Sequence, residues 1–143
     1  MRIAAMTGTM LAVGMLAGCA TGAPTAKVGE CLDIAVGQST VTELARVACT
    51  QEHDAEVYLV QTIDLEAFDA AAVAQEAQRI CRDAFYSFVG ATYEESILDI
   101  YMLYPQQQSW DGGDREVICA VYKPDREQGR PERLSSSLED SRL

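Results

Sequence analysis

Five cysteines, at positions 19, 31, 49, 81 and 119, place the strongest constraint on how this 143-residue chain can fold. If the chain is exported and its cysteines oxidise, an odd number leaves one thiol without a partner in the same chain. Cys19 differs from the other four because it directly follows an apolar run near the N-terminus. The sequence therefore separates one cysteine with its own role from four that can form disulfides.

Residues 1–18 have the pattern of a signal peptide. Arg2 precedes an apolar run at 3–17, which is too short and too interrupted for a stable membrane span. The end of this run, Leu16-Ala17-Gly18-Cys19, resembles the bacterial lipobox, and an ordinary signal peptide is the alternative. The pattern predicts an exported lipoprotein whose diacylglyceryl (palmitate-type) anchor on Cys19 holds it at the outer face of the cytoplasmic membrane. Residues 19–27 would then be the lipidated cysteine and a flexible tether.

Acidic residues dominate the chain, with 22 Asp and Glu against 11 Lys and Arg, for a formal net charge of −11. The basic residues form no patch, so a nucleic-acid partner is excluded. Residues 27–124 hold 17 acidic and 6 basic residues, which favours a cationic partner and salt-sensitive association. The tail at 125–143 is nearly neutral and poor in apolar residues, so we expect it to be disordered.

Hydrophobic periodicity predicts a small α+β domain at 28–124 with the order βββαββ. Residues 31–34 and 44–49 predict a hairpin, and 55–63 a longer strand with Val57 and Leu59 on one face and Glu56 and Tyr58 on the other. Two further strands are predicted at 97–104 and 115–123. The resulting antiparallel sheet of about five short strands would pack on one helix.

That helix is predicted from about Asp69, as its N-terminal cap, to Val89, with Gly90 in the left-handed position that ends it. Apolar residues recur there every three or four positions, which is the spacing of one helix face. The residues of this stripe are Val73, Ala77, Ile80, Cys81, Ala84, Phe85 and Phe88.

Four cysteines allow three disulfide connectivities. Cys81 lies on the apolar stripe of the helix, and Cys119 shares strand parity with the apolar residues of its strand, so packing would bring the two together. Cys31 and Cys49 lie on the predicted hairpin. We therefore favour Cys31–Cys49 and Cys81–Cys119, which would stabilise a small exported domain. A zinc or redox site is disfavoured because the chain has no CxxC motif.

His53, the one histidine, is flanked by carboxylates in Gln51-Glu52-His53-Asp54-Ala55-Glu56. Such a group could bind a metal or act as an acid–base pair. On a strand, however, His53 points inward and Asp54 and Glu56 point outward, so we favour a structural histidine that hydrogen-bonds the turn. We expect no metal, no cofactor and no catalytic residue, and retain His53, Asp54 and Glu56 as candidate binding residues.

The segment from Ser109 to Arg115 joins the single Trp110 to an acidic, glycine-rich turn. An exposed tryptophan there could be an aromatic platform for a sugar or a peptide, which makes Trp110, Asp114 and Arg115 candidate binding residues. The alternative, which we favour, is that Trp110 covers the core while an Asp114–Arg115 salt bridge fixes the turn.

Several of these motifs occur together in one known family. Val28-Gly29-Glu30-Cys31-Leu32-Asp33, Val47-Ala48-Cys49 and His53-Asp54-Ala55-Glu56-Val57 resemble the opening of the septum formation family of actinobacterial envelope proteins. The resemblance covers about residues 28–122 and continues through Cys81, Phe85, Val89-Gly90, Tyr93, Ser96, Pro105, Trp110, Gly113-Asp114-Arg115 and Cys119. Glu52 stands where the family often has proline. The resemblance implies a non-enzymatic extracytoplasmic module linked to division septa.

Together these features predict a lipid-anchored interaction module in cell division or envelope assembly, with an envelope or division protein as its partner. The alternative is a lipoprotein that binds a small ligand or a cell-wall fragment at Trp110. An enzyme would depend on His53 alone.

Overall fold

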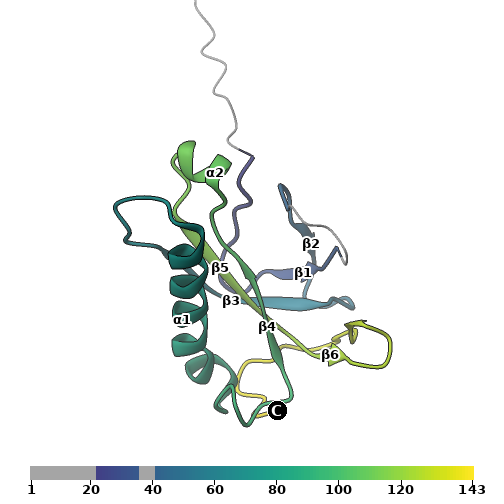
Figure 1. Ribbon diagram of the computed structural model, residues 1–143. Helices are drawn as coiled ribbons and strands as arrows, with labels where there is room; N and C mark the ends of the chain where they lie inside the picture. The colour runs from purple at the N-terminus through teal and green to yellow at the C-terminus, as the bar shows by residue number, and fades with distance from the viewer. Residues whose placement is uncertain (1–21, 36–40) are drawn as a thin grey trace, which may run out of the picture.

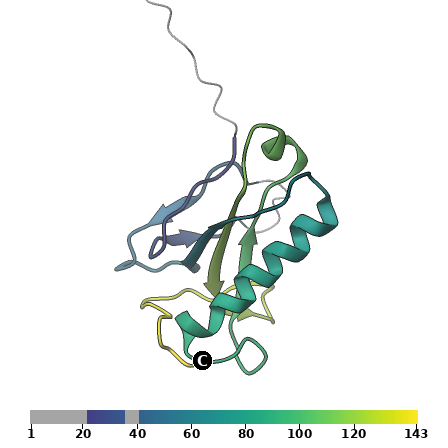
Figure 2. The same cartoon turned by 90° about the vertical axis from the view of Figure 1, so that its left-hand side faces the viewer.

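The computed structural model describes residues 22–35 and 41–143, and its centre is a five-stranded antiparallel sheet (Figure 1). The predicted signal peptide and Cys19 lie outside these residues. The strands are β1 (Cys31–Asp33), β2 (Ala45–Val47), β3 (Ala55–Thr62), β4 (Asp99–Leu103) and β5 (Glu116–Tyr122), in the spatial order β2-β1-β3-β5-β4. Helix α1 (Ala70–Val89) crosses one face of the sheet (Figure 2). The predicted α+β class, with five strands on one main helix, is confirmed.

Three small elements were not expected from the sequence. They are α2 (Gln107–Asp111), between β4 and β5, and the ribbon of β6 (Pro124–Asp125) and β7 (Arg130–Pro131) after β5. Part of the predicted tether also lies against the domain, because Ala26 packs on the sheet and the Thr25 carbonyl accepts a hydrogen bond from Arg46.

Helix α1 begins and ends as its sequence predicts. The Asp69 carboxylate accepts a hydrogen bond of 2.8 Å from the Ala72 N–H, which satisfies one of the free donors of the first turn. Gly90 ends the helix with a φ of 78°, in the left-handed region that favours glycine. The buried residues of the helix are Val73, Ala77, Ile80, Cys81, Phe85 and Val89. Within the described part of the chain, no helix is long and apolar enough to cross a membrane.

Strand β3 departs from the predicted alternation. A register shift in its pairing with β5 falls between Val57 and Leu59, so the strand bulges at Tyr58. Tyr58 and Leu59 therefore both pack on the α1 side, whereas Val57 packs in a second apolar cluster with Leu32 and Ile118. The expectation that Val57 and Leu59 share a face was wrong because the extra residue reverses the alternation beyond it.

Both predicted disulfides are present. Cys81–Cys119 joins the middle of α1 to β5 beneath it, and both sulfurs are in the core. Cys31–Cys49 closes the β1–β2 hairpin, where β1 and β2 pair through Cys31 and Val47. One bond thus holds the two layers together, and the other holds the outer hairpin.

The buried phenol of Tyr58 gives the domain a specific sensitivity to alkali. Its hydroxyl donates a hydrogen bond of 2.7 Å to the Cys81 carbonyl, and burial raises the pKa of Tyr58 well above its usual range. The neutral phenol therefore stabilises the fold fully below about pH 10, the unfolded pKa, and this contribution is lost as the pH rises through the folded pKa.

We expect the Tyr58→Phe substitution to lower the free energy of unfolding by about 1 kcal/mol at neutral pH, because the hydrogen bond is lost. Above pH 10 the variant should lose stability less steeply than the unmodified chain. Denaturant titrations followed by circular dichroism at pH 7 to 11 measure both effects. Tyr86→Phe, at an exposed tyrosine of α1, is the matched control. Identical pH profiles for the unmodified chain and Tyr58→Phe would contradict this role.

The expectation of a disordered tail was wrong. Residues 132–142, here called the C-terminal strap, cross the end of the sheet and reach the end of α1 (Figure 1). Leu134 and Leu138 are buried in the same cluster as α1. The composition of the tail suggested disorder because these are its only apolar residues before the terminal leucine. Both leucines nevertheless pack in the core cluster that α1 and the sheet form.

Candidate functional site

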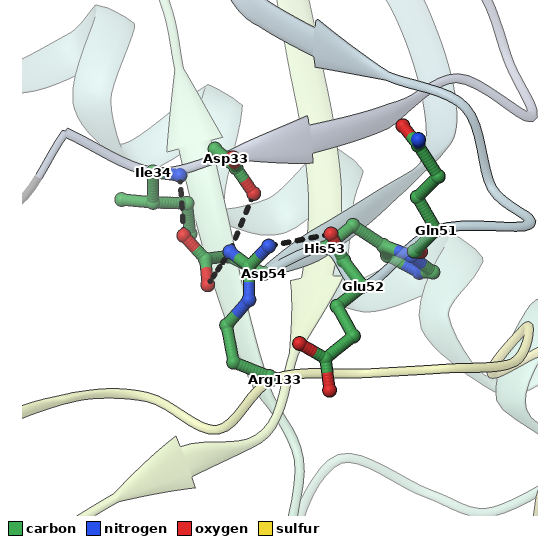
Figure 3. Close-up of polar contacts among 7 residues, drawn as sticks. All are labelled: Asp33, Ile34, Gln51, Glu52, His53, Asp54 and Arg133. Carbon is green, nitrogen blue, oxygen red and sulfur yellow. Dashed lines mark hydrogen bonds and ion pairs between the residues drawn. The ribbon is translucent and has the colours of Figure 1, made fainter.

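The His53 motif lies just before and within the start of β3, underneath the strap (Figure 3). The His53 backbone N–H donates to the Leu134 carbonyl at 3.0 Å, and the Leu134 N–H donates to the His53 carbonyl at 2.7 Å. These two bonds pair the motif with the strap as a short antiparallel bridge. We call the contacts of His53, Asp54 and Glu56 with the strap the clasp.

The His53 ring is fully buried and fixes the preceding turn. Its Nδ1 lies 2.9 Å from the Gln51 carbonyl, and because a carbonyl only accepts, Nδ1 carries the proton and donates. Nε2 is buried and has no hydrogen-bond partner among the described residues. The prediction of a structural histidine that hydrogen-bonds its turn is confirmed. The ring has no exposed surface from which to exchange a proton with a bound substrate.

Asp54 joins β1 to the strap. Its Oδ2 accepts a hydrogen bond of 2.8 Å from the Ile34 N–H, and its Oδ1 accepts one of 2.8 Å from Arg133 Nη1. The same Arg133 nitrogen lies 2.6 Å from Asp33 Oδ1, and the other terminal nitrogen donates to the Glu52 carbonyl (Figure 3). These hydrogen bonds, first that with Asp33, raise the pKa of the Arg133 guanidinium. One arginine thus joins three segments of chain.

Glu56 holds the next part of the strap. Its Oε1 accepts a hydrogen bond of 2.9 Å from the Ser137 hydroxyl, and its Oε2 accepts one of 2.9 Å from the Leu138 N–H. Asp54 and Glu56 are both largely buried, so the expectation that they point to solvent was wrong. The strap covers the face on which alternation places them and supplies donors to three of the four carboxylate oxygens, while the Ile34 N–H supplies the fourth.

The strap continues from the clasp to the end of α1. The Asp140 N–H donates to the Phe88 carbonyl and the Arg142 N–H to the Val89 carbonyl, both at 2.8 Å. Helix ends leave such carbonyls without partners, and the strap satisfies them. A Cβ atom added at Gly90 would lie 3.2 Å from Arg142 Cγ, so glycine also leaves room for the strap.

Trp110 is a core residue. It lies on α2 and is 6% exposed, with its ring 5.8 Å from that of Phe68. The Arg115 guanidinium stacks 3.4 Å from the ring centroid, and its Nη1 donates to the Trp110 and Asp114 carbonyls. This supports the interpretation that Trp110 covers the core. The expected Asp114–Arg115 salt bridge is not among the ion pairs of the described residues: Arg115 donates to backbone oxygens, and the Asp114 carboxylate accepts the Glu116 N–H.

The candidate binding residues therefore form two separate groups, one at the clasp and one around Trp110. Among the described residues, no cluster of three His, Cys, Asp or Glu side chains is arranged to hold a metal ion. Sequence reasoning missed Arg133, Ser137 and the two strap leucines. The one signal in the sequence for a docked tail was the pair Leu134 and Leu138. Two leucines four residues apart can both pack against the same apolar surface.

Comparison with known proteins adds one match. A family model described as septum formation matches residues 28–142. This range includes the strap and all residues of the clasp, beyond residue 122 where the resemblance in the sequence ended. No curated protein matches the chain, and no solved structure matches it.

Proposed function

Because this chain belongs to the septum formation family, which indicates a role in cell division, we propose that it acts there as a lipid-anchored, non-enzymatic interaction module. The observation that carries the proposal is the family match over residues 28–142. Every residue that builds the clasp lies inside that range. The module would work on the outer face of the cytoplasmic membrane.

The burial and the hydrogen bonds of His53, Asp54 and Glu56 support a non-enzymatic role. His53 is buried with Nδ1 donating to a carbonyl, and both oxygens of Asp54 and of Glu56 are hydrogen-bonded. A general acid or base must reach the proton it transfers. These three side chains instead hold one part of the chain against another.

Export and anchoring are supported by the cysteines. Two disulfides are typical of a protein that folds in an oxidising compartment, and Cys19 in its lipobox-like setting provides an acylation site. Gly22 lies near α2, in a hollow shared with Gln106 and Ser109. An anchor three residues earlier could be no more than about 11 Å from Gly22, so the α2 end would face the membrane.

The partner we propose is a cationic segment of an envelope or division protein. The large excess of acidic residues over basic ones favours such a partner through long-range attraction. Association of this kind weakens as salt is added.

The test uses the full chain fused through a linker after Leu143 to a fluorescent protein, expressed in dividing cells of its own host. We expect the fusion in the membrane fraction and enriched at septa relative to the lateral wall. The Cys19→Ala variant should leave the membrane fraction because it lacks the acylated thiol, while Thr21→Ala, a neighbouring change, should not.

Each result bears on a different part of the proposal. Retention of Cys19→Ala in the membrane fraction would overturn the lipid anchor. A uniform signal around the cell, together with normal septa after depletion, would overturn the role in division.

A further inference from the structure

The face of the sheet opposite α1 carries a cavity of about 390 Å³ that neither the clasp nor Trp110 uses. Tyr101 of β4 and Tyr122 of β5 line it, and Pro124 and Pro131 of the β6–β7 ribbon form one wall. Tyr101 pairs with Ala120, and Tyr122 pairs with Ala55. Each tyrosine thus has an alanine as a cross-strand neighbour, and Tyr122 also pairs with Asp99 of β4.

The cavity has a basic rim in an acidic protein. Arg126 and Arg130 line it, and no carboxylate in the described residues lies within ion-pairing distance of either guanidinium. Within residues 22–35 and 41–143, the Arg130 side chain donates only to the Gln128 side-chain oxygen, which leaves its remaining donors without a partner there. Asp125 also lines the cavity, but its Oδ1 accepts the N–H groups of Glu127 and Gln128. The described part of the lining thus has two cations and one anion.

The two tyrosines offer ring faces together with neutral hydroxyls. Burial raises the pKa of Tyr101 and of Tyr122, so both phenols stay protonated around neutral pH. The Tyr122 hydroxyl lies 3.4 Å from Asp99 Oδ2, while the other oxygen of Asp99 accepts the Tyr93 hydroxyl at 2.7 Å. The Asp99 carboxylate, which the Tyr93 hydroxyl holds in place, therefore orients the Tyr122 hydroxyl.

We propose that this cavity binds an anionic sugar. Aromatic faces pack against the C–H faces of a pyranose ring, and guanidinium groups bind carboxylate or phosphate through paired hydrogen bonds. The volume is in the range of small-molecule sites. The site is independent of the proposed lipid anchor and septal location, since it depends only on Tyr101, Tyr122, Arg126 and Arg130.

The test compares three sugars on the full, isotopically labelled chain by NMR titration. N-acetylmuramic acid carries a carboxylate, N-acetylglucosamine 6-phosphate carries a phosphate, and N-acetylglucosamine is the neutral control. We expect at least one charged sugar to bind about tenfold more tightly than the neutral one. The neutral sugar lacks the anionic group and so cannot make the charge-assisted hydrogen bonds to the guanidinium groups. The tighter of the two identifies which anion the site prefers. Shifts should centre on Tyr101, Tyr122 and Gly129, and leave the Trp110 indole unchanged.

Two variants separate this site from general electrostatics. Arg126→Gln combined with Arg130→Gln should weaken the charged sugar about tenfold or more, whereas Arg79→Gln, on the exposed side of α1, should not. A dispersed spectrum verifies that the double variant is folded. The proposal is overturned if no sugar shifts the cavity resonances, if the neutral sugar binds equally well, or if the double variant binds the charged sugar unchanged.

Discussion

Replacing Leu138 by alanine is expected to lower the free energy of unfolding by about 2–4 kcal/mol, although only five residues of the given sequence follow it. The side chain is 4% exposed and packs in the cluster that contains α1, so its loss removes buried apolar contacts. Urea titration followed by circular dichroism measures the change. A disordered tail would predict no change at all, so the experiment distinguishes the two views directly.

Glu139→Ala is the matched control for this prediction. Its side chain is exposed and adjacent in sequence, so we expect a change within about 0.5 kcal/mol. Hydrogen exchange gives a second readout, because the Leu134 and Leu138 amides donate to His53 and Glu56. Both amides should be protected in the unmodified chain and exchange faster in Leu138→Ala. Rapid exchange at both in the unmodified chain would show that the strap is not docked.

Removing the Cys81–Cys119 disulfide should have the larger effect of the two disulfide deletions. The bond closes a separation of 38 residues, for which the chain-entropy relation gives about 4 kcal/mol, against about 3 kcal/mol for the 18 residues of Cys31–Cys49. Cys81 and Cys119 are also fully buried, so alanine at both positions leaves empty space in the core. We expect the Cys81→Ala, Cys119→Ala variant to be unfolded or barely folded at 37 °C.

The Cys31→Ala, Cys49→Ala variant is the comparison. It loosens a hairpin at the edge of the sheet, where Cys49 is exposed, and the helix-to-sheet contact remains. Thermal unfolding of both variants under the same conditions measures the difference. Equal losses, or a greater loss for the hairpin variant, would mean that the core disulfide does not have the role assigned to it here.

Local patterns in the sequence were sufficient for α1, for the five strands and for both disulfides. In each case the signal is a spacing within a short segment, as with Asp69, Gly90 and the stripe between them. Helix α2 was not predicted because five residues are too few to show the hydrophobic periodicity of a helix. The bulge at Tyr58 was not predicted because it depends on how β3 pairs with β5, and the sequence of β3 alone does not indicate that pairing.

The clasp shows the same limit at longer range. Arg133 and Asp54 are 79 residues apart, and nothing near either one indicates the other. Alternation along β3 placed Asp54 and Glu56 on the face opposite His53, but it could not reveal that a later segment covers this face. The cavity beside Tyr101 and Tyr122 was missed for a related reason, since its walls come from β4, β5 and the ribbon after β5.

The position of the strap after all the helices and strands of the described chain also sets an order of events during synthesis. Leu134 pairs with His53, and Leu138 packs in the core, so no part of the clasp can form before these residues have left the ribosome. Contacts that span so much of the chain are slow to form. The domain therefore completes its fold only after the strap has been synthesised, and the chain up to β7 has to stay incompletely folded until then.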